Sequence, residues 1–204
     1  MAIMLLLAAA IPVAAGPKPA TNTTLGIIAS PRIFNASTAD QAAQDCGDAS
    51  TATGLKDKEA AVANITKKGG VDGSPGYALG KLVPTPKCAA GVIDLSGVDG
   101  IVLNRLGFDV TGYCGAGAPR FNVDLVDGRS LFIGCDGMTT ANTFTDSNGV
   151  DWTTKRADLS GLGIENAEVA DMQIVFDEEG RGVLDNIAIS NATLNGGKAK
   201  KHKK

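Results

Sequence analysis

Carboxylates are the side chains of this sequence with the widest choice of chemistry, because histidine is almost absent. A serine or cysteine nucleophile normally needs a histidine base, and the single histidine, His202, lies in the lysine-rich C-terminal end. Two carboxyl groups suffice for glycoside hydrolysis, and Asp124, Asp136 and the run Asp177–Glu179 supply candidates. The run precedes Gly180, a pattern typical of an acidic turn between strands. We therefore expect a protein that is not an enzyme, with a small glycoside hydrolase as the least favoured function.

Calcium is the metal that this composition suits best, since it takes oxygen ligands from carboxylates and turns. Asp136, Asp185 and the loop Asp146–Asp151 are the candidate ligands, although the sequence holds no EF-hand loop. Zinc is disfavoured because there is no Cys-x-x-Cys pair and the one histidine is near the C-terminus. We expect no cofactor, and structural calcium is the one candidate metal.

Four cysteines, Cys46, Cys88, Cys114 and Cys135, fit a protein that folds outside the cytoplasm. They can pair in three ways. We favour Cys114 with Cys135, because the Gly-Ala-Gly-Ala-Pro loop can bring the first beside the second, and Cys46 with Cys88 then follows by elimination. Residues 1–16 are apolar and end in small residues, as in a secretory signal peptide, although no positive charge precedes the apolar run. We expect a secreted protein with no membrane-spanning segment after signal cleavage.

Two alternating segments around an Asp-Gly pair predict a β-hairpin over residues 120–135. A two-residue loop would mix apolar and polar side chains on both faces. A three-residue loop, with the glycine in the left-handed conformation, pairs Phe121 with Ile133. Val123 then meets Leu131, and the hairpin has one apolar face. We therefore expect the three-residue loop.

The opposite face of this hairpin carries polar side chains and one aromatic: Arg120, Asn122, Asp124, Ser130 and Phe132. Such a face is usually solvated in an antiparallel sheet, and the alternative is a ligand-binding face. Trp152, the only tryptophan, begins another alternating segment, where it is either a stacking platform for a sugar ring or a residue packed at the sandwich edge. The candidate ligand-binding residues are Arg120, Asn122, Asp124, Phe132 and Trp152.

Composition and strand spacing predict one all-β domain. Gly, Pro, Thr, Asn and Asp are abundant and aromatic residues are scarce, as in folds with many turns. Regularly spaced strand patterns predict an antiparallel β-sandwich of jelly-roll type. The predicted strands lie near 90–95, 101–110, 120–126, 129–135, 150–158, 167–177 and 182–189, with earlier extended pieces near 25–34 and 77–83.

Two similar segments, Asp94-Leu95-Ser96-Gly97-Val98 and Asp158-Leu159-Ser160-Gly161-Leu162, lie between predicted strands. We expect each to be a corner where the chain passes from one sheet to the other. The predicted N-terminal helix, at the edge of the sandwich, covers residues 55–68, where Asp57 can cap its start and Lys67-Lys68-Gly69-Gly70 can end it.

Four segments make up the predicted organisation of the chain. They are a signal peptide (1–16), a flexible N-terminal segment (17–54), the sandwich with its edge helix (55–190) and a basic disordered tail (191–204).

The segment Trp152–Ser160, followed by a strand and then by Gly182-Val183-Leu184-Asp185-Asn186-Ile187-Ala188-Ile189, resembles the closing half of the galactose-binding-like jelly rolls. Many carbohydrate-binding modules belong to that class and end in such a strand. The resemblance covers roughly residues 88–190. It implies that Asp185 and Asn186 serve structure rather than sugar contact. One tryptophan and two tyrosines are few for the exposed platforms of sugar-binding members.

We expect a secreted, non-catalytic binding module for carbohydrate or a cell-wall polymer, active as a monomer. Residues 115–123 also resemble uncharacterised secreted proteins of actinobacterial type, which have no assigned activity. The alternative is a structural or protein-interaction module of the cell envelope. Nucleic acid is disfavoured by charge, because five of the 19 basic residues are tail lysines and the chain before residue 198 carries 14 basic and 22 acidic residues, a net charge of −8.

Overall fold

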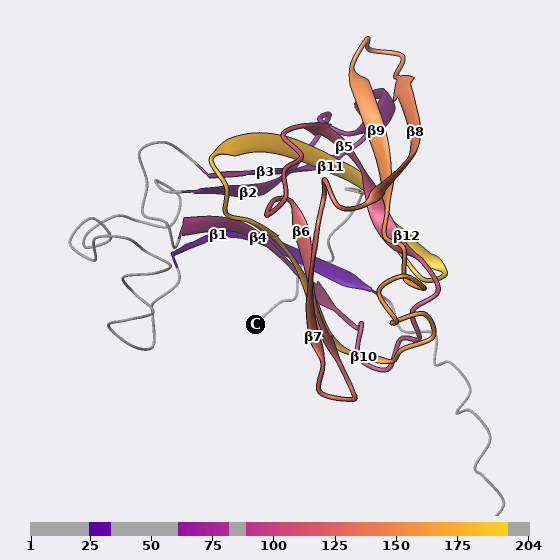
Figure 1. The fold of residues 1–204 in the computed structure, drawn as a ribbon. Helices are drawn as coiled ribbons and strands as arrows, with labels where there is room; N and C mark the ends of the chain where they lie inside the picture. The colour runs from indigo at the N-terminus through magenta and orange to yellow at the C-terminus, as the bar shows by residue number, and fades with distance from the viewer. Residues whose placement is uncertain (1–24, 34–60, 82–88, 196–204) are drawn as a thin grey trace, which may run out of the picture.

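The computed structural model of the protein describes residues 25–33, 61–81 and 89–195. Two antiparallel sheets face each other across a hydrophobic core, so the fold is an all-β antiparallel sandwich, as predicted (Figure 1). Within these three ranges, no helix is long and apolar enough to cross a membrane.

The first sheet has five strands in the order β1-β4-β10-β6-β7, so that β7 lies at one edge. In chain order its strands are β1 (Gly26–Ile33), β4 (Ala89–Ser96), β6 (Arg120–Leu125), β7 (Ser130–Gly134) and β10 (Val169–Phe176).

The second sheet has the order β2-β3-β11-β5-β9-β8, and a short β12 pairs with β11. Its strands are β2 (Ala61–Thr66), β3 (Gly76–Lys81), β5 (Leu106–Gly112), β8 (Thr139–Thr145), β9 (Asp151–Arg156), β11 (Gly180–Ile189) and β12 (Ala192–Leu194). A 3₁₀ turn, Val71–Gly73, stands between β2 and β3. The β8–β9 hairpin extends away from the body of the sandwich (Figure 1).

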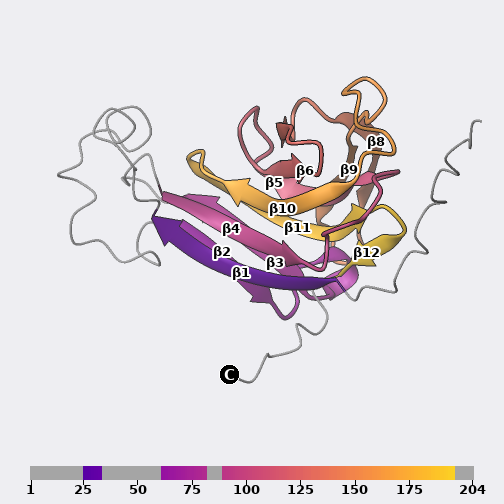
Figure 2. The ribbon, with the colours of Figure 1, turned by 90° about the horizontal axis from the view of Figure 1, so that it is seen from below.

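Side chains that alternate along the strands form the core between the two layers. Phe121, Val123 and Leu125 of β6 point into it, and the residues between them point outward. Phe121 packs against Phe108 of β5 with ring centroids 5.4 Å apart. Since β5 belongs to the second sheet, this pair joins the layers, and Figure 2 shows β1 and β4 of one layer next to β2 and β3 of the other. Burial of each phenylalanine contributes about 1.5–3 kcal/mol.

The β6–β7 hairpin has the predicted register. Phe121 is opposite Ile133, and Val123 is opposite Leu131. The loop contains three residues and ends in Gly128 at φ +88°, a left-handed conformation that costs glycine little. Gly128 N donates to Leu125 O at 3.0 Å, and Leu125 N donates to Arg129 O at 2.9 Å. The sequence argument for the three-residue loop is confirmed.

The two similar segments are corners between the sheets, as expected. Residues 94–98 lead from β4 in the first sheet to β5 in the second, and residues 158–162 lead from β9 in the second sheet to β10 in the first. The segments that follow the two corners are hydrogen-bonded to each other. Leu103 N donates to Ala167 O at 2.8 Å, and Val169 N donates to Ile101 O at 2.9 Å. The two connections between the sheets therefore stabilise each other. Because residues 101–103 take part in this contact, β5 begins at Leu106, later than the predicted 101–110.

The helix predicted over residues 55–68 is wrong where the structure describes it, because Ala61–Thr66 form β2. Ala61 and Ala63 are buried while Asn64 and Ile65 are exposed, and every residue of β2 pairs with β3. Three of these six residues are β-branched and favour a strand, so the flanking cap and stop signals do not decide the local structure. Residues 55–60 lie outside the described ranges.

The sandwich is longer at both ends than the predicted 55–190. β1 is the early extended piece predicted near 25–34, although it falls within the segment expected to be flexible, and all eight of its residues pair with β4. β12 falls within the predicted disordered tail and pairs with β11. β8 was not predicted, since its seven residues are Thr-rich and lack a buried side chain that would reveal the alternation. The predicted signal peptide, residues 1–16, lies outside the described chain.

Candidate ligand-binding face

The outer face of the five-stranded sheet carries four of the five predicted ligand-binding residues. Residues directly opposite each other on neighbouring antiparallel strands lie side by side on one face. The pairing registers therefore place one row of residues across the whole sheet. From β1 to β7 this transverse row is Ile28, Asp94, Gln173, Asn122 and Phe132. Its ends are apolar and exposed, 61% for Ile28 and 71% for Phe132, and its centre is polar.

Phe132 stands at the β7 end of the transverse row and is the most exposed large apolar side chain of the described residues. The Arg120 guanidinium lies 5.6 Å from the centroid of its ring, within cation–π distance. Most of the ring remains open to solvent. A planar apolar surface beside a fixed cation is therefore presented on the outer face.

Arg120 is held in place by three neighbours. Its Nε donates to Asn122 Oδ1 at 2.9 Å, and its Nη1 donates to Gly117 O at 2.8 Å and to the Asp177 carboxylate. The ion pair with Asp177 is half-buried on both sides. Charge-assisted bonds of this kind are stronger than neutral ones. The guanidinium position beside Phe132 is therefore set before any ligand arrives.

Asp124 extends the polar part of the face along β6. It is exposed and accepts a hydrogen bond from Ser130 Oγ at 2.5 Å. Asp171 of β10 lies directly opposite it, so two carboxylates are neighbours on this face. Like charges in that position repel, and both remain accessible to donors from outside the protein.

Gln173 is a residue of this face that the sequence analysis missed. It pairs with Asp94 on one side and with Asn122 on the other, at the middle of the transverse row. Its Oε1 is buried and has no hydrogen-bond partner among the described residues. A buried acceptor without a partner is costly and rare. The signal in the sequence is a glutamine within the apolar run Met172-Gln173-Ile174-Val175, which places a polar group where the strand alternation points outward.

A rigid loop, residues 113–119, borders the face next to Arg120. The predicted disulfide joins Cys114 to Cys135 and is confirmed, while Cys46 and Cys88 lie outside the described residues. Gly115 N donates to Ala118 O at 2.7 Å and closes the loop as a turn.

Glu178 fixes the same loop from the β10–β11 turn. One of its oxygens accepts from Gly117 N and the other from the Tyr113 hydroxyl, both at 2.9 Å. The bond to this carboxylate raises the pKa of Tyr113. The acidic run Asp177–Glu179 is a turn between two strands, as predicted, and its first two residues position the loop and Arg120.

Trp152 does not belong to this face, and the prediction of a stacking platform there is wrong. It lies in β9 of the second sheet and is 2% exposed. Its Nε1 donates to Asp146 Oδ2 at 3.2 Å. The single tryptophan is thus a packed residue at the sandwich edge, the other interpretation of its position at a strand start.

The carboxylates predicted as calcium ligands are occupied in other ways or stand apart. Asp185 is buried in β11, and its Oδ2 accepts from Val71 N at 2.9 Å and Ser74 Oγ at 2.8 Å. Asp136 is exposed at the end of the β7 hairpin. No group of three or more His, Cys, Asp or Glu side chains that could hold a metal occurs in the described ranges.

The loop Asp146–Asp151 is closed by its own backbone. Asp146 accepts from the N–H groups of Val150, Asn148 and Asp72, at 2.9, 2.9 and 3.1 Å, as well as from the indole. These donors, the Val150 amide first, lower the pKa of the Asp146 carboxyl. Hydrogen bonds to the charged form have this effect. Asp146 therefore folds the loop onto the 3₁₀ turn at residues 71–73.

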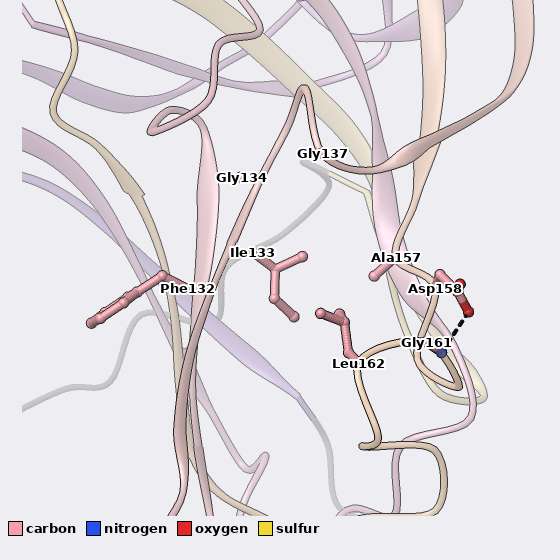
Figure 3. A pocket seen from close by; sticks show the side chains of 8 residues that line it. All are labelled: Phe132, Ile133, Gly134, Gly137, Ala157, Asp158, Gly161 and Leu162. Carbon is pink, nitrogen blue, oxygen red and sulfur yellow. Dashed lines mark hydrogen bonds between the residues drawn. The ribbon is translucent and has the colours of Figure 1, made fainter.

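A pocket of about 320 Å³ adjoins the outer face at the free edge of β7. It lies between β7 and the corner that follows β9. Figure 3 shows Ile133 and Leu162 pointing toward each other across it, while Phe132 points away to the outer face. The lining residues are Phe132, Ile133, Gly134, Gly137, Ala157, Asp158, Gly161 and Leu162.

No protein-family model, curated protein or solved structure matches this chain. Its function must be argued from the outer face itself. That face combines an open aromatic ring, a fixed guanidinium, an amide and two neighbouring carboxylates. This set can stack against and hydrogen-bond a hydroxyl-rich ligand.

Proposed function

We propose that this protein is a secreted, non-catalytic binding module that holds a carbohydrate or cell-wall polymer on the outer face of its five-stranded sheet. The observation that carries the proposal is the exposed Phe132 ring, which lies beside the fixed Arg120 guanidinium and is followed in the transverse row by Asn122. A sugar ring offers an apolar face for stacking and hydroxyl groups that donate and accept.

The arrangement suits a polymer better than a small compact ligand. The open part of the face lies over β6 and β7, where Asp124, Ser130 and Phe132 are exposed, whereas Val92 and Val175 further across the sheet are buried. A linear chain could lie along these two strands, which are about 4.8 Å apart. Small-molecule sites are usually concave, whereas this row is a sheet surface. The disulfide and the predicted signal peptide support an extracellular location. The resemblance to galactose-binding-like modules supports the same ligand class.

Affinity electrophoresis of the full chain in gels containing neutral, anionic or amine-bearing soluble polysaccharides tests the proposal. We expect retardation by at least one polymer. Phe132→Ala should weaken it about 3- to 10-fold, since an aromatic contact contributes about 0.5–1.5 kcal/mol beyond its area. Phe144→Ala is the matched control, because Phe144 lies on β8 of the other sheet.

The lysine-rich C-terminal end requires a control of its own, because lysines attract anionic polymers without specificity. A variant with the five tail lysines replaced by serine should keep its retardation by the specific polymer. If no polymer retards the wild type, or if Phe132→Ala and Phe144→Ala behave alike, the proposed face is not a sugar-binding surface. Retardation that vanishes with the tail lysines alone would contradict it equally.

A further inference from the structure

The free edge of β7 offers backbone hydrogen-bonding groups that no other strand of the described ranges uses. β7 is the last strand of its sheet, and β6 is its partner on the other side. The hairpin bonds identify which residues face β6. Leu125 N bonds to Arg129 O next to the loop, so the pairs that exchange hydrogen bonds further along are Val123 with Leu131 and Phe121 with Ile133.

The alternate residues of β7 therefore direct their N–H and C=O groups away from the sheet. These residues are Ser130, Phe132 and Gly134, and no hydrogen bond from their backbone occurs outside the strands in the described residues. Unpaired groups along a strand edge form a template for one more strand. Two of the three, Phe132 and Gly134, line the pocket of about 320 Å³.

The opposite wall of the pocket limits what can bind there. It is the corner after β9, with Ala157 and Leu162, and Leu162 is 40% exposed and points toward Ile133 (Figure 3). Arg129 links the hairpin to this corner, because its Nη1 donates to Gly163 O at 3.0 Å. The cleft is thus walled on both sides and bridged near the hairpin loop. The broad edge of a second sandwich does not fit between such walls, whereas a single extended chain does.

We propose that this cleft binds a short, extended, basic peptide segment as an additional strand on β7. The peptide backbone pairs with Phe132 and its neighbours at the free edge, and one small apolar side chain enters between Ile133 and Leu162. The charge of the peptide follows from Asp158, an exposed carboxylate that lines the pocket and forms no ion pair in the described part of the chain. This inference is independent of the carbohydrate proposal.

Fluorescence polarisation with a labelled peptide tests the inference on the full chain. The probe is acetyl-Lys-Val-Ala-Val-Lys-amide, and its matched control is the same peptide with N-methyl groups on alternate residues. We expect saturable binding of the probe and at least about a tenfold loss for the N-methylated form, because strand addition depends on main-chain bonds. A glutamate-flanked version of the probe should bind more weakly. Equal binding of probe and N-methylated control would overturn the inference.

Variants of the two walls separate this cleft from the outer face. Leu162→Trp fills the pocket and should abolish peptide binding, while Leu162→Ala removes one apolar contact and should weaken binding without abolishing it. Phe132→Ala removes the ring but retains its N–H, so it should weaken sugar binding and leave peptide binding within about threefold. Phe132→Pro removes the outward N–H, a change that edge strands tolerate, and should abolish peptide binding.

Controls for folding and for self-association complete the test of peptide binding. Far-ultraviolet circular dichroism and urea unfolding establish whether the variants fold. If Phe132→Pro does not fold, Leu162→Trp alone tests whether the peptide occupies the cleft. Absence of probe binding up to millimolar concentration overturns the inference. Sedimentation that shows a wild-type dimer, lost in Leu162→Trp, would assign the cleft to a second copy of this chain and overturn the peptide as its occupant.

Discussion

Replacement of Asp185 by alanine should be among the most destabilising single changes in the second sheet. The side chain is buried in β11 and accepts three hydrogen bonds, from Val71 N at 2.9 Å, Ser74 Oγ at 2.8 Å and Asn186 N at 2.8 Å. The first two come from the turn between β2 and β3. Alanine leaves all three donors without this acceptor and releases the turn from β11.

The magnitude follows from the number of donors. A hydrogen bond contributes about 1 kcal/mol net, and a buried donor left unsatisfied costs about 1–3 kcal/mol. Three donors at the lower value predict a loss of about 3 kcal/mol in the free energy of unfolding for Asp185→Ala. Ser74→Ala removes one donor together with its need for a partner, so it should cost about 1 kcal/mol. In the Asp185→Ala background the same serine change should cost almost nothing.

Urea unfolding followed by the fluorescence of Trp152 measures these values, because it is the only tryptophan and is buried in the folded state. The double-mutant cycle should return a coupling energy of about 1 kcal/mol between Asp185 and Ser74. A loss below about 1 kcal/mol for Asp185→Ala, or a coupling near zero, would refute the role of Asp185 as the anchor of the turn. A calcium-dependent rise in the wild-type midpoint would instead make Asp185 a metal ligand.

Four further changes test other parts of the fold. Cys114→Ala/Cys135→Ala should lower the free energy of unfolding by about 3 kcal/mol in urea, since the disulfide spans 21 residues of sequence; no change would mean that the bond does not form. Gly134→Ala should destabilise by about 2 kcal/mol, because its new Cβ would overlap a backbone oxygen of the disulfide-bonded loop. Gly137→Ala should be nearly neutral, because the nearest atom to its new Cβ would be 3.6 Å away. Equal melting temperatures for the two glycine variants would contradict this difference. Burial, first among the causes, raises the pKa of Tyr77 from 10.0 to about 12. Its contribution to stability is therefore complete below pH 10 and is lost as the pH rises toward 12, and unfolding of Tyr77→Phe over this range should lack that part of the slope.

The local sequence determined the β6–β7 hairpin and its disulfide. Only the three-residue loop places Phe121 and Ile133 on one face, and the strand period of two leaves no intermediate register. The Cys114–Cys135 pair follows from that register. The same alternation indicated in advance that Arg120 and Phe132 share the opposite face. These features are predictable because they depend on neighbours within about 20 residues of sequence.

The transverse row, by contrast, exists only in the folded sheet. Gln173 joins Asn122 on the outer face because β10 pairs with β6 across about 50 residues of sequence, and no local pattern indicates that partner. The pocket beside β7 likewise depends on how the corner after β9 packs near the hairpin.

Tertiary contacts also decided the residues whose local sequence allowed two outcomes. Residues 61–66 follow a capping signal at Asp57 that favours a helix, yet three of the six are β-branched and their pairing with β3 makes them a strand. Trp152 lies at the start of an alternating segment, and the sequence does not show whether its side of the strand is covered. The bond to Asp146 and the packing around the β8–β9 hairpin bury it. Strand period is a property of the chain, whereas the covering of a face is a property of the assembled layers.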